Sequence, residues 1–205
     1  MEFAPMSHLN PTFFELLSSE PTREVALPEE TLLQDVSGLL SDPSGLVRFC
    51  TPEPERLGYA AWRFCDSSSS DCLRLLTDVA VPIETRLSLT GGLKTLFAEL
   101  FDPHCDPVLQ HSLEPGQYLN MACAMFWDIA PLGPQTAGKT GIAPACADVM
   151  RFQLALANPA CRESALSGVE QWIGVEPDLM KSVLETCDFN DEPIEALRKR
   201  ASGLV

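Results

Sequence analysis

The clearest indication of the fold lies in three stretches of similar sequence, LLSDPSGLVRFC at 39–50, ELFDPHCDPVLQ at 99–110 and ALANPACRESAL at 155–166. In each stretch an Asp or Asn precedes a proline, and the pair lies between apolar segments. A side-chain oxygen at this position accepts a hydrogen bond from an unpaired N–H of the first turn, and a proline at the first helical position loses no bond that the helix needs. The pattern therefore predicts helix starts, at Asn10-Pro11, Asp42-Pro43, Thr51-Pro52, Asp102-Pro103 and Asn158-Pro159.

The segments between these pairs carry the spacing of amphipathic helices. Apolar residues recur at intervals of three and four, as in Leu89, Leu93 and Leu96 or in Cys161, Ala165 and Val169. Leu and Ala, which favour helices, greatly outnumber the β-branched Ile and Val, which favour strands. We therefore expect an all-α fold, an array of roughly eight to ten short helices in a single domain over 1–205.

The three stretches also suggest an internal repeat. Their Asp-Pro and Asn-Pro pairs align in register, at separations of 60 and 56 residues. Degenerate repeats would then occupy 27–66, 82–130 and 143–188, each with an apolar helix, a turn and a second amphipathic helix. The pattern, strongest at LLSDPSGLVR, resembles HEAT-like repeats, which implies a stack of helical pairs. The alternative is an irregular α-solenoid or bundle in which these pairs only start helices.

A second resemblance involves the tract from Trp127 through ANPACRESALSGVEQWI. It is similar to segments of uncharacterised bacterial helical proteins in which a Cys-x-Glu-Ser-Ala-Leu run is followed by histidines. This chain has Ser167 and Glu170 in that region instead. The resemblance implies a helical fold and a bacterial origin, and it implies no activity.

Three places interrupt the helical pattern. The serine-rich segment 66–71 and the Gly- and Pro-rich segment 131–142 predict exposed loops. Gly91 and Gly92 lie inside a good helical face, where each glycine costs about 1 kcal/mol relative to alanine. They predict either a break in the helix or a close crossing with another helix.

The charge of the chain restricts its partners. A formal net charge of −15 disfavours direct binding to nucleic acid or to an anionic membrane, because both would repel the protein. A basic protein is the electrostatically favoured partner. The sequence leaves the oligomeric state undetermined.

The cysteines indicate a cytoplasmic protein. The chain has 8 of them, spread through apolar helical stretches, and we expect most to be small buried side chains rather than members of disulfides. The N-terminus lacks a basic region followed by an apolar run, and no stretch reaches the roughly 18 apolar residues of a membrane span.

One segment matches a chemical motif in full. Residues 133–140, GPQTAGKT, satisfy the P-loop pattern, in which the loop amides hold phosphate, Lys139 contacts the terminal phosphates and Thr140 binds Mg²⁺. Gly133 and Gly138 supply its glycines. A P-loop follows a strand and opens into a long helix, whereas the residues before this segment favour a helix and Pro144 soon follows it. Nucleotide binding is therefore the alternative function.

No other set of residues predicts catalysis, a metal or a cofactor. His104, Cys105, His111 and Cys123 have suitable donor atoms for zinc, but their spacing matches no known zinc site. The histidines lie in no recognisable nucleophile context. We expect a protein without enzymatic activity.

The remaining hypothesis is a protein-interaction module with an acidic helical surface. Large aromatic and charged residues near the last two stretches predict its contact residues: Trp127, Asp128, Arg162, Glu163, Glu170 and Trp172. An immunity or antitoxin-like protein that blocks a toxic effector is one concrete form of this hypothesis. An acidic mimic of nucleic acid is a further alternative, whose binding to a basic protein would weaken steeply with salt.

Overall fold

The described part of the chain is all-α, as predicted. A computed structural model describes residues 10–19, 29–53, 55–185 and 199, and these contain helices and no strand. The longer helices are α1 (Pro11–Leu17), α2 (Glu29–Ser41), α3 (Ser44–Cys50), α4 (Glu55–Cys65), α5 (Ile83–Leu96), α7 (Tyr118–Ala124), α10 (Ala143–Leu154), α11 (Pro159–Trp172) and α12 (Pro177–Leu184). Shorter elements are η1 (Cys72–Leu76), η2 (Phe97–Phe101), α6 (Asp102–His104), η3 (Gln110–Ser112), α8 (Phe126–Ile129) and α9 (Pro134–Ala137).

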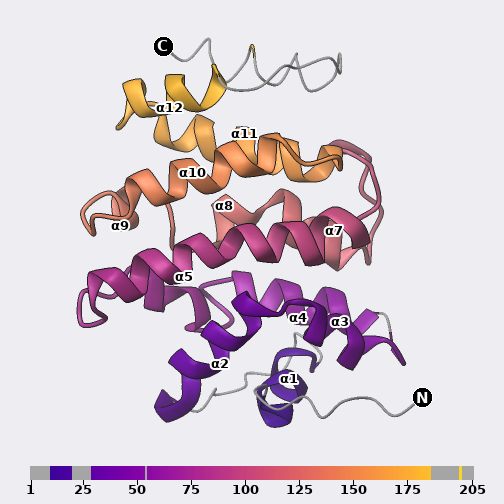
Figure 1. The fold of residues 1–205 in the computed structure, drawn as a ribbon. Coiled ribbons are helices and arrows are strands. Elements are labelled where there is room, and N and C mark those ends of the chain that lie inside the picture. Colours follow the sequence, from indigo (N-terminus) through magenta and orange to yellow (C-terminus); the bar gives the residue numbers. More distant parts are fainter. Residues whose placement is uncertain (1–9, 20–28, 54, 186–198, 200–205) are drawn as a thin grey trace.

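The helices stack in successive layers (Figure 1). Helices α2, α5, α10 and α12 pack one on the next, and beside them α1, α4, α7 and α11 form a second row. We name α2–α4 with the following segment to residue 78 the first layer, α5–α8 with the following segment to residue 142 the second and α10–α11 the third. Helices α1 and α12 lie at opposite ends of the stack.

The proposed repeats map onto these layers without establishing a relationship between them. The ranges 27–66, 82–130 and 143–188 contain α2–α4, α5–α8 and α10–α12, although residues 27, 28 and 186–188 lie outside the described residues. The HEAT-like resemblance stays a prediction.

Two of the five predicted helix starts have the expected cap. Asn10 accepts a hydrogen bond from the N–H of Thr12 at 3.0 Å, and Asn158 accepts one from Ala160 at 3.0 Å. At the third, Asp42 accepts a hydrogen bond from the N–H of Gly45, and α3 begins one residue after the proline. Local capping chemistry therefore explains these starts.

At the other two pairs the prediction differs from the structure, because neither Thr51 nor Asp102 caps a new helix. Thr51-Pro52 lies in the turn between α3 and α4, which begins only at Glu55. Asp102-Pro103 lies where the helical run that began as α5 ends, after the π-helical turn η2. In that turn the N–H of Asp102 donates to the carbonyl of Phe97, five residues back. A proline after a regular α-turn would clash with the carbonyl four residues earlier, and the wider turn accommodates it.

Asp102 instead joins the second layer to the third. Its carboxylate accepts the N–H of Asn158 at 2.8 Å, and its carbonyl accepts the side-chain amide of Asn158 at 3.2 Å. The same amide donates to the carbonyl of Cys105 at 2.8 Å. Two positions that align in the sequence are therefore in direct contact.

The expected interruption at Gly91-Gly92 is a close helix crossing. Helix α5 runs through both residues, and a Cβ on Gly92 would lie 2.9 Å from the Cβ of Leu40 in α2. Real Cβ atoms are not found this close to another carbon, so any residue larger than glycine at position 92 would push α5 and α2 apart. Of the two predicted loops, 66–71 contains no helix, but 131–142 includes the short helix α9.

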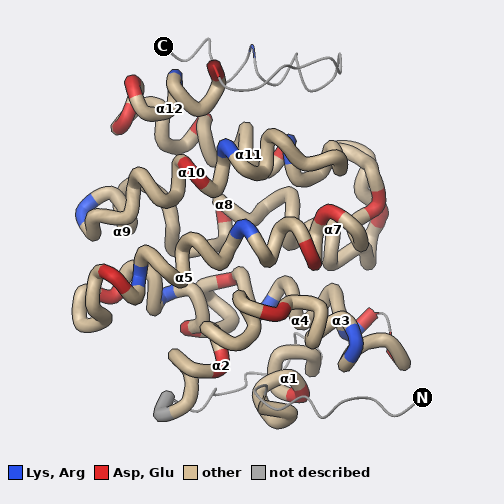
Figure 2. The backbone as a smooth tube through the Cα atoms, in the orientation of Figure 1, with Lys and Arg blue, Asp and Glu red and all other residues tan. Residues whose placement is uncertain are grey.

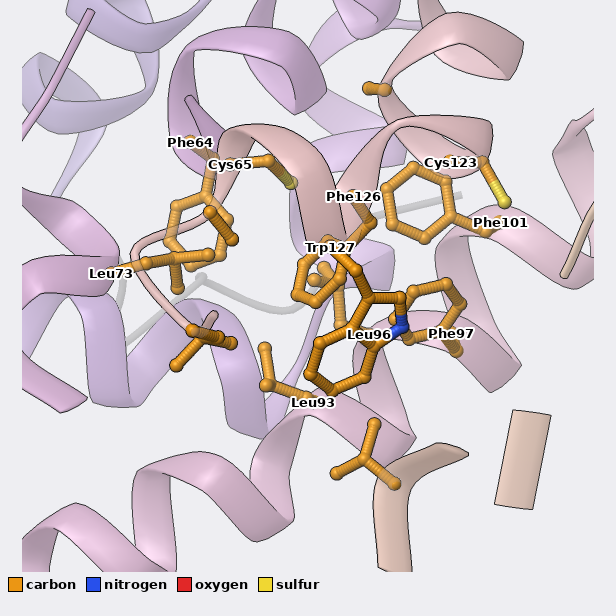
Figure 3. Close-up of a cluster of buried hydrophobic side chains, with 14 of the residues drawn as sticks. Phe64, Cys65, Leu73, Leu93, Leu96, Phe97, Phe101, Cys123, Phe126 and Trp127 are labelled. Carbon is orange, nitrogen blue, oxygen red and sulfur yellow. The ribbon is translucent and has the colours of Figure 1, made fainter. Parts of the chain in front are cut away.

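A continuous apolar core runs through the layers. Figure 3 shows the indole of Trp127 among Leu93, Leu96, Phe97 and Phe126. The ring centroids of Phe126 lie 5.3 Å from Trp127 and 5.0 Å from Phe97, both in edge-to-face arrangements. These core contacts hold α8 in place, and the segment that begins at residue 130 follows it directly.

Candidate binding site

An open pocket of about 700 Å³ lies where the three layers meet. The segment after α4 forms one wall, α8, α9 and their connection form another, and α11 contributes a single residue. The lining residues are Ser67, Arg74, Thr77, Asp78, Trp127, Asp128, Ile129, Ala130, Pro131, Gly133, Gln135, Thr136 and Gln171. Most of the side chains among them that reach solvent are polar or charged.

Hydrogen bonds between the layers hold these walls together. The N–H of Ser67 donates to the carbonyl of Ile129 at 3.1 Å, joining the first layer to the second. The indole N–H of Trp172 donates to the carbonyl of Leu132 at 3.1 Å, joining the third layer to the second. Segments that are far apart in the sequence are therefore joined directly at the pocket.

Hydrogen bonds to Asp66 order the serine-rich segment 66–71, which borders the pocket. Asp66 is buried, and it accepts hydrogen bonds from the N–H of Ser68 at 2.9 Å and from the hydroxyls of Ser68 and Ser69. Burial alone raises the pKa of the Asp66 carboxyl, but these hydrogen bonds outweigh it and the net pKa is lowered. The carboxylate therefore orders the loop that carries Ser67.

Asp128 is the most firmly positioned carboxylate of the pocket. Its Oδ1 accepts a hydrogen bond from the side-chain amide of Gln171 at 2.8 Å, and its Oδ2 accepts one from the hydroxyl of Ser167 at 3.4 Å. Both donors lie on α11, whereas Asp128 lies on α8. Its side chain is nevertheless exposed, so its remaining lone pairs face solvent.

The lining carries uncompensated negative charge. Arg74, its only basic residue, forms an ion pair with Asp71 at 3.1 Å and donates to the carbonyl of Ser67 at 3.2 Å. Within the described part of the chain, Asp78 and Asp128 form no ion pair with a basic side chain. The pocket therefore favours a cation.

The structure corrects the expected role of the two tryptophans. Trp127 is 1% and Trp172 0% exposed, so neither indole offers an aromatic surface to a partner. Trp127 donates its N–H to Gln153 at 3.0 Å and packs so closely on α11 that a Cβ on Gly168 would lie 2.8 Å from its Cγ. Both side chains are core residues that support the pocket from inside.

The other predicted contact residues on α11 lie outside this pocket. Arg162, Glu163 and Glu170 are half-buried. Glu163 accepts the N–H of Gln110 at 2.6 Å, which attaches the loop after α6 to the third layer. Of the six residues predicted from the sequence, Trp127 and Asp128 line the pocket, and only Asp128 presents an exposed side chain there.

The P-loop-like segment forms a compact helical turn. The N–H groups of Thr136 and Ala137 donate to the carbonyl of Gly133, and that of Gly138 donates to the carbonyl of Pro134. Both the N–H and the hydroxyl of Thr140 donate to the carbonyl of Ala137. These amides and the hydroxyl are thus already paired within the chain, and the preceding element is α8 rather than a strand. Lys139 is exposed.

The described cysteines are buried, in agreement with the sequence. Burial raises the pKa of Cys72 and of Cys146 to about 12, and it is the largest cause in both. The described residues contain no group of three or more His, Cys, Asp or Glu that could hold a metal ion. Cys187 lies outside the described residues.

Sequence reasoning missed Arg74, Asp78, Gln135 and Gln171. The two segments singled out as irregular, 66–71 and 131–142, supply Ser67, Pro131, Gly133, Gln135 and Thr136, so their irregularity was the available signal. Gln171 lines the pocket because α11 packs against α8, and no local sequence pattern predicts that packing.

Two further observations are not specific to the pocket. No helix in the described ranges combines the length and hydrophobicity that a membrane span requires. Comparison of the chain with protein-family models, curated proteins and solved structures found no match.

Proposed function

We propose that this protein is a non-enzymatic interaction module whose pocket binds a basic segment of a protein partner. One observation carries the proposal: Asp78 and Asp128, from different layers, line a single open pocket and form no ion pair with a basic side chain of the described residues. A positively charged side chain of a partner would supply that counterpart.

The order of the site supports this proposal. Asp128 is already held by Gln171 and Ser167, so binding would cost little side-chain entropy at this residue. The stacked layers bring together segments that are far apart in the sequence, which is how helical stacks form extended binding surfaces.

The charge of the whole molecule also supports it. The net charge of −15 attracts a basic partner over a distance of about one Debye length, roughly 8 Å at physiological salt. Figure 2 shows acidic residues spread along the whole stack, with a group at the start of α12. Such a field accelerates association, whereas the pocket provides the local contacts.

An immunity or antitoxin-like inhibitor is one form of this function. In that form the basic segment belongs to a toxic effector, and occupation of the pocket blocks the effector. We place the protein in a bacterial cytoplasm, where a reducing environment suits its buried thiols.

Selection of peptides tests the proposal. A library of random linear peptides is selected against the folded protein, and binders are measured against an Asp78→Asn/Asp128→Asn double variant. We expect binders with net positive charge whose affinity falls about tenfold or more in the double variant, because two charge-assisted contacts are lost.

A matched control separates local from global charge. Asp178→Asn/Glu185→Gln makes the same change in net charge at exposed residues in and just after α12, away from the pocket. Binding should be nearly unchanged in this control. Equal losses in both variants would contradict a local site, and an affinity dominated by salt in every variant would instead favour the acidic mimic of nucleic acid.

A further inference from the structure

The pocket contains a group of hydrogen-bond acceptors centred on Gly133. A Cβ on this residue would lie 3.8 Å from the side-chain oxygen of Gln135 and 3.8 Å from that of Gln171. Both amide oxygens therefore lie close to this residue, although they come from α9 and α11.

The orientation of Gln171 is fixed by its neighbour. Its Nε2 donates to Oδ1 of Asp128 at 2.8 Å, which directs Oε1 away from that carboxylate. Asp128 lines the same pocket, and each carboxylate oxygen can accept more than one hydrogen bond. The pocket lining thus offers one carboxylate and two amide oxygens as acceptors for a bound cation.

This set of acceptors suits a guanidinium group better than an ammonium group. Guanidinium is planar and carries five N–H donors in a fixed arrangement, whereas ammonium is a compact and more strongly hydrated charge with three. Acceptors contributed by different elements match a planar group with donors on several edges.

We infer that the pocket selects an arginine side chain of the partner over a lysine side chain, through Asp128, Gln135 and Gln171. This inference rests on the proposed function and specifies its partner. Asp78 adds charge at the same pocket.

Gly133 leaves the acceptors accessible. Its backbone is extended, with φ −68° and ψ 161°, which alanine also adopts. A methyl group there would make only ordinary contacts at 3.8 Å, yet it would occupy space beside both oxygens. Gly133→Ala therefore obstructs the site without disturbing the fold.

The test uses two small cations of similar size, N-ethylguanidinium and n-butylammonium, added to isotopically labelled protein. Chemical shifts of the side-chain amides of Gln135 and Gln171 and of the indole of Trp127 are followed by NMR. We expect saturable shifts with N-ethylguanidinium, about tenfold weaker binding of n-butylammonium, and a similar loss in Gly133→Ala. Gly174→Ala is the control, since a Cβ there meets no atom within 4 Å.

The outcomes separate this inference from the proposed function. Equal responses to both cations, abolished in the Asp78→Asn/Asp128→Asn variant, would overturn arginine selectivity and leave the acidic site standing. No response to either cation, together with no basic peptide from the selection, would overturn both. Unchanged guanidinium binding in a folded Gly133→Ala protein would also overturn the inference.

Discussion

The contact between the second and third layers predicts that Asn158→Ala is strongly destabilising. Asn158 is 7% exposed, and its side chain makes three hydrogen bonds: the cap to Ala160 and the bonds to the carbonyls of Asp102 and Cys105. Loss of an N-cap costs about 1 kcal/mol. Each lost hydrogen bond costs about the same, and more where a buried acceptor stays unpaired. We therefore expect a loss of about 3 kcal/mol in the free energy of unfolding, or about 6–12 °C in Tm for a chain of this length.

Urea unfolding followed by circular dichroism measures this loss, with Asn10→Ala as the matched control. Asn10 caps α1 and makes one further bond, a long one of 3.4 Å to Asp35, so its replacement should cost only about 1 kcal/mol. Asn158→Asp keeps the cap but turns the amide donor into a carboxylate oxygen that faces the carbonyls of Asp102 and Cys105, so it should cost at least as much as Asn158→Ala. If Asn158→Ala costs no more than Asn10→Ala, the bonds between the layers contribute nothing and the reasoning is refuted.

Four further predictions follow from the same contacts. Gly168→Ala should destabilise the protein by about 1–2 kcal/mol in urea unfolding, because its Cβ would lie 2.8 Å from Trp127 Cγ, whereas Gly174→Ala should be neutral or stabilising; equal stabilities would contradict the close packing. The lowered pKa of Asp66 means that it stabilises the fold above its unfolded pKa of about 3.9 and that this contribution is lost as the pH falls through its folded pKa; unfolding between about pH 5 and 3 should therefore depend less on pH in Asp66→Asn, and parallel curves would argue against it. Cys72 and Cys146 should resist alkylation in the native protein, since burial raises both pKa values to about 12; mass spectrometry that finds them modified as fast as in urea would exclude this burial. Mg²⁺-ATP and Mg²⁺-GTP should leave the Tm unchanged, because the amides of 136–138 are paired within the chain; a saturable stabilisation abolished by Lys139→Ala would establish the nucleotide-binding alternative.

The fold class could be predicted because it depends on local chemistry. Helical spacing and the caps at Asn10 and Asn158 act within a few residues, and each appears where the sequence indicated. Asp102-Pro103 has the same local signal, but the packing of α5 continues the helix through it, so tertiary structure overrides the capping pattern.

The candidate site was less predictable because its parts are far apart in the sequence. Asp128 was identified as a charged residue beside a tryptophan, and it lines the pocket. The same rule selected Trp127 and Trp172, which are both buried, Trp127 where α8 approaches α11 closely at Gly168. The local sequence around Asp78 and Gln171 carries no motif. Both residues line the pocket only because the layers pack against one another.

The most direct test of the binding site is NMR chemical-shift mapping with the tightest basic peptide from the selection. We expect the perturbed amides to fall in 67–78, in 127–136 and around Gln171, three segments that only the folded stack brings together. Perturbations confined to α1–α3, or to α12, would place the binding surface elsewhere and contradict the proposed function.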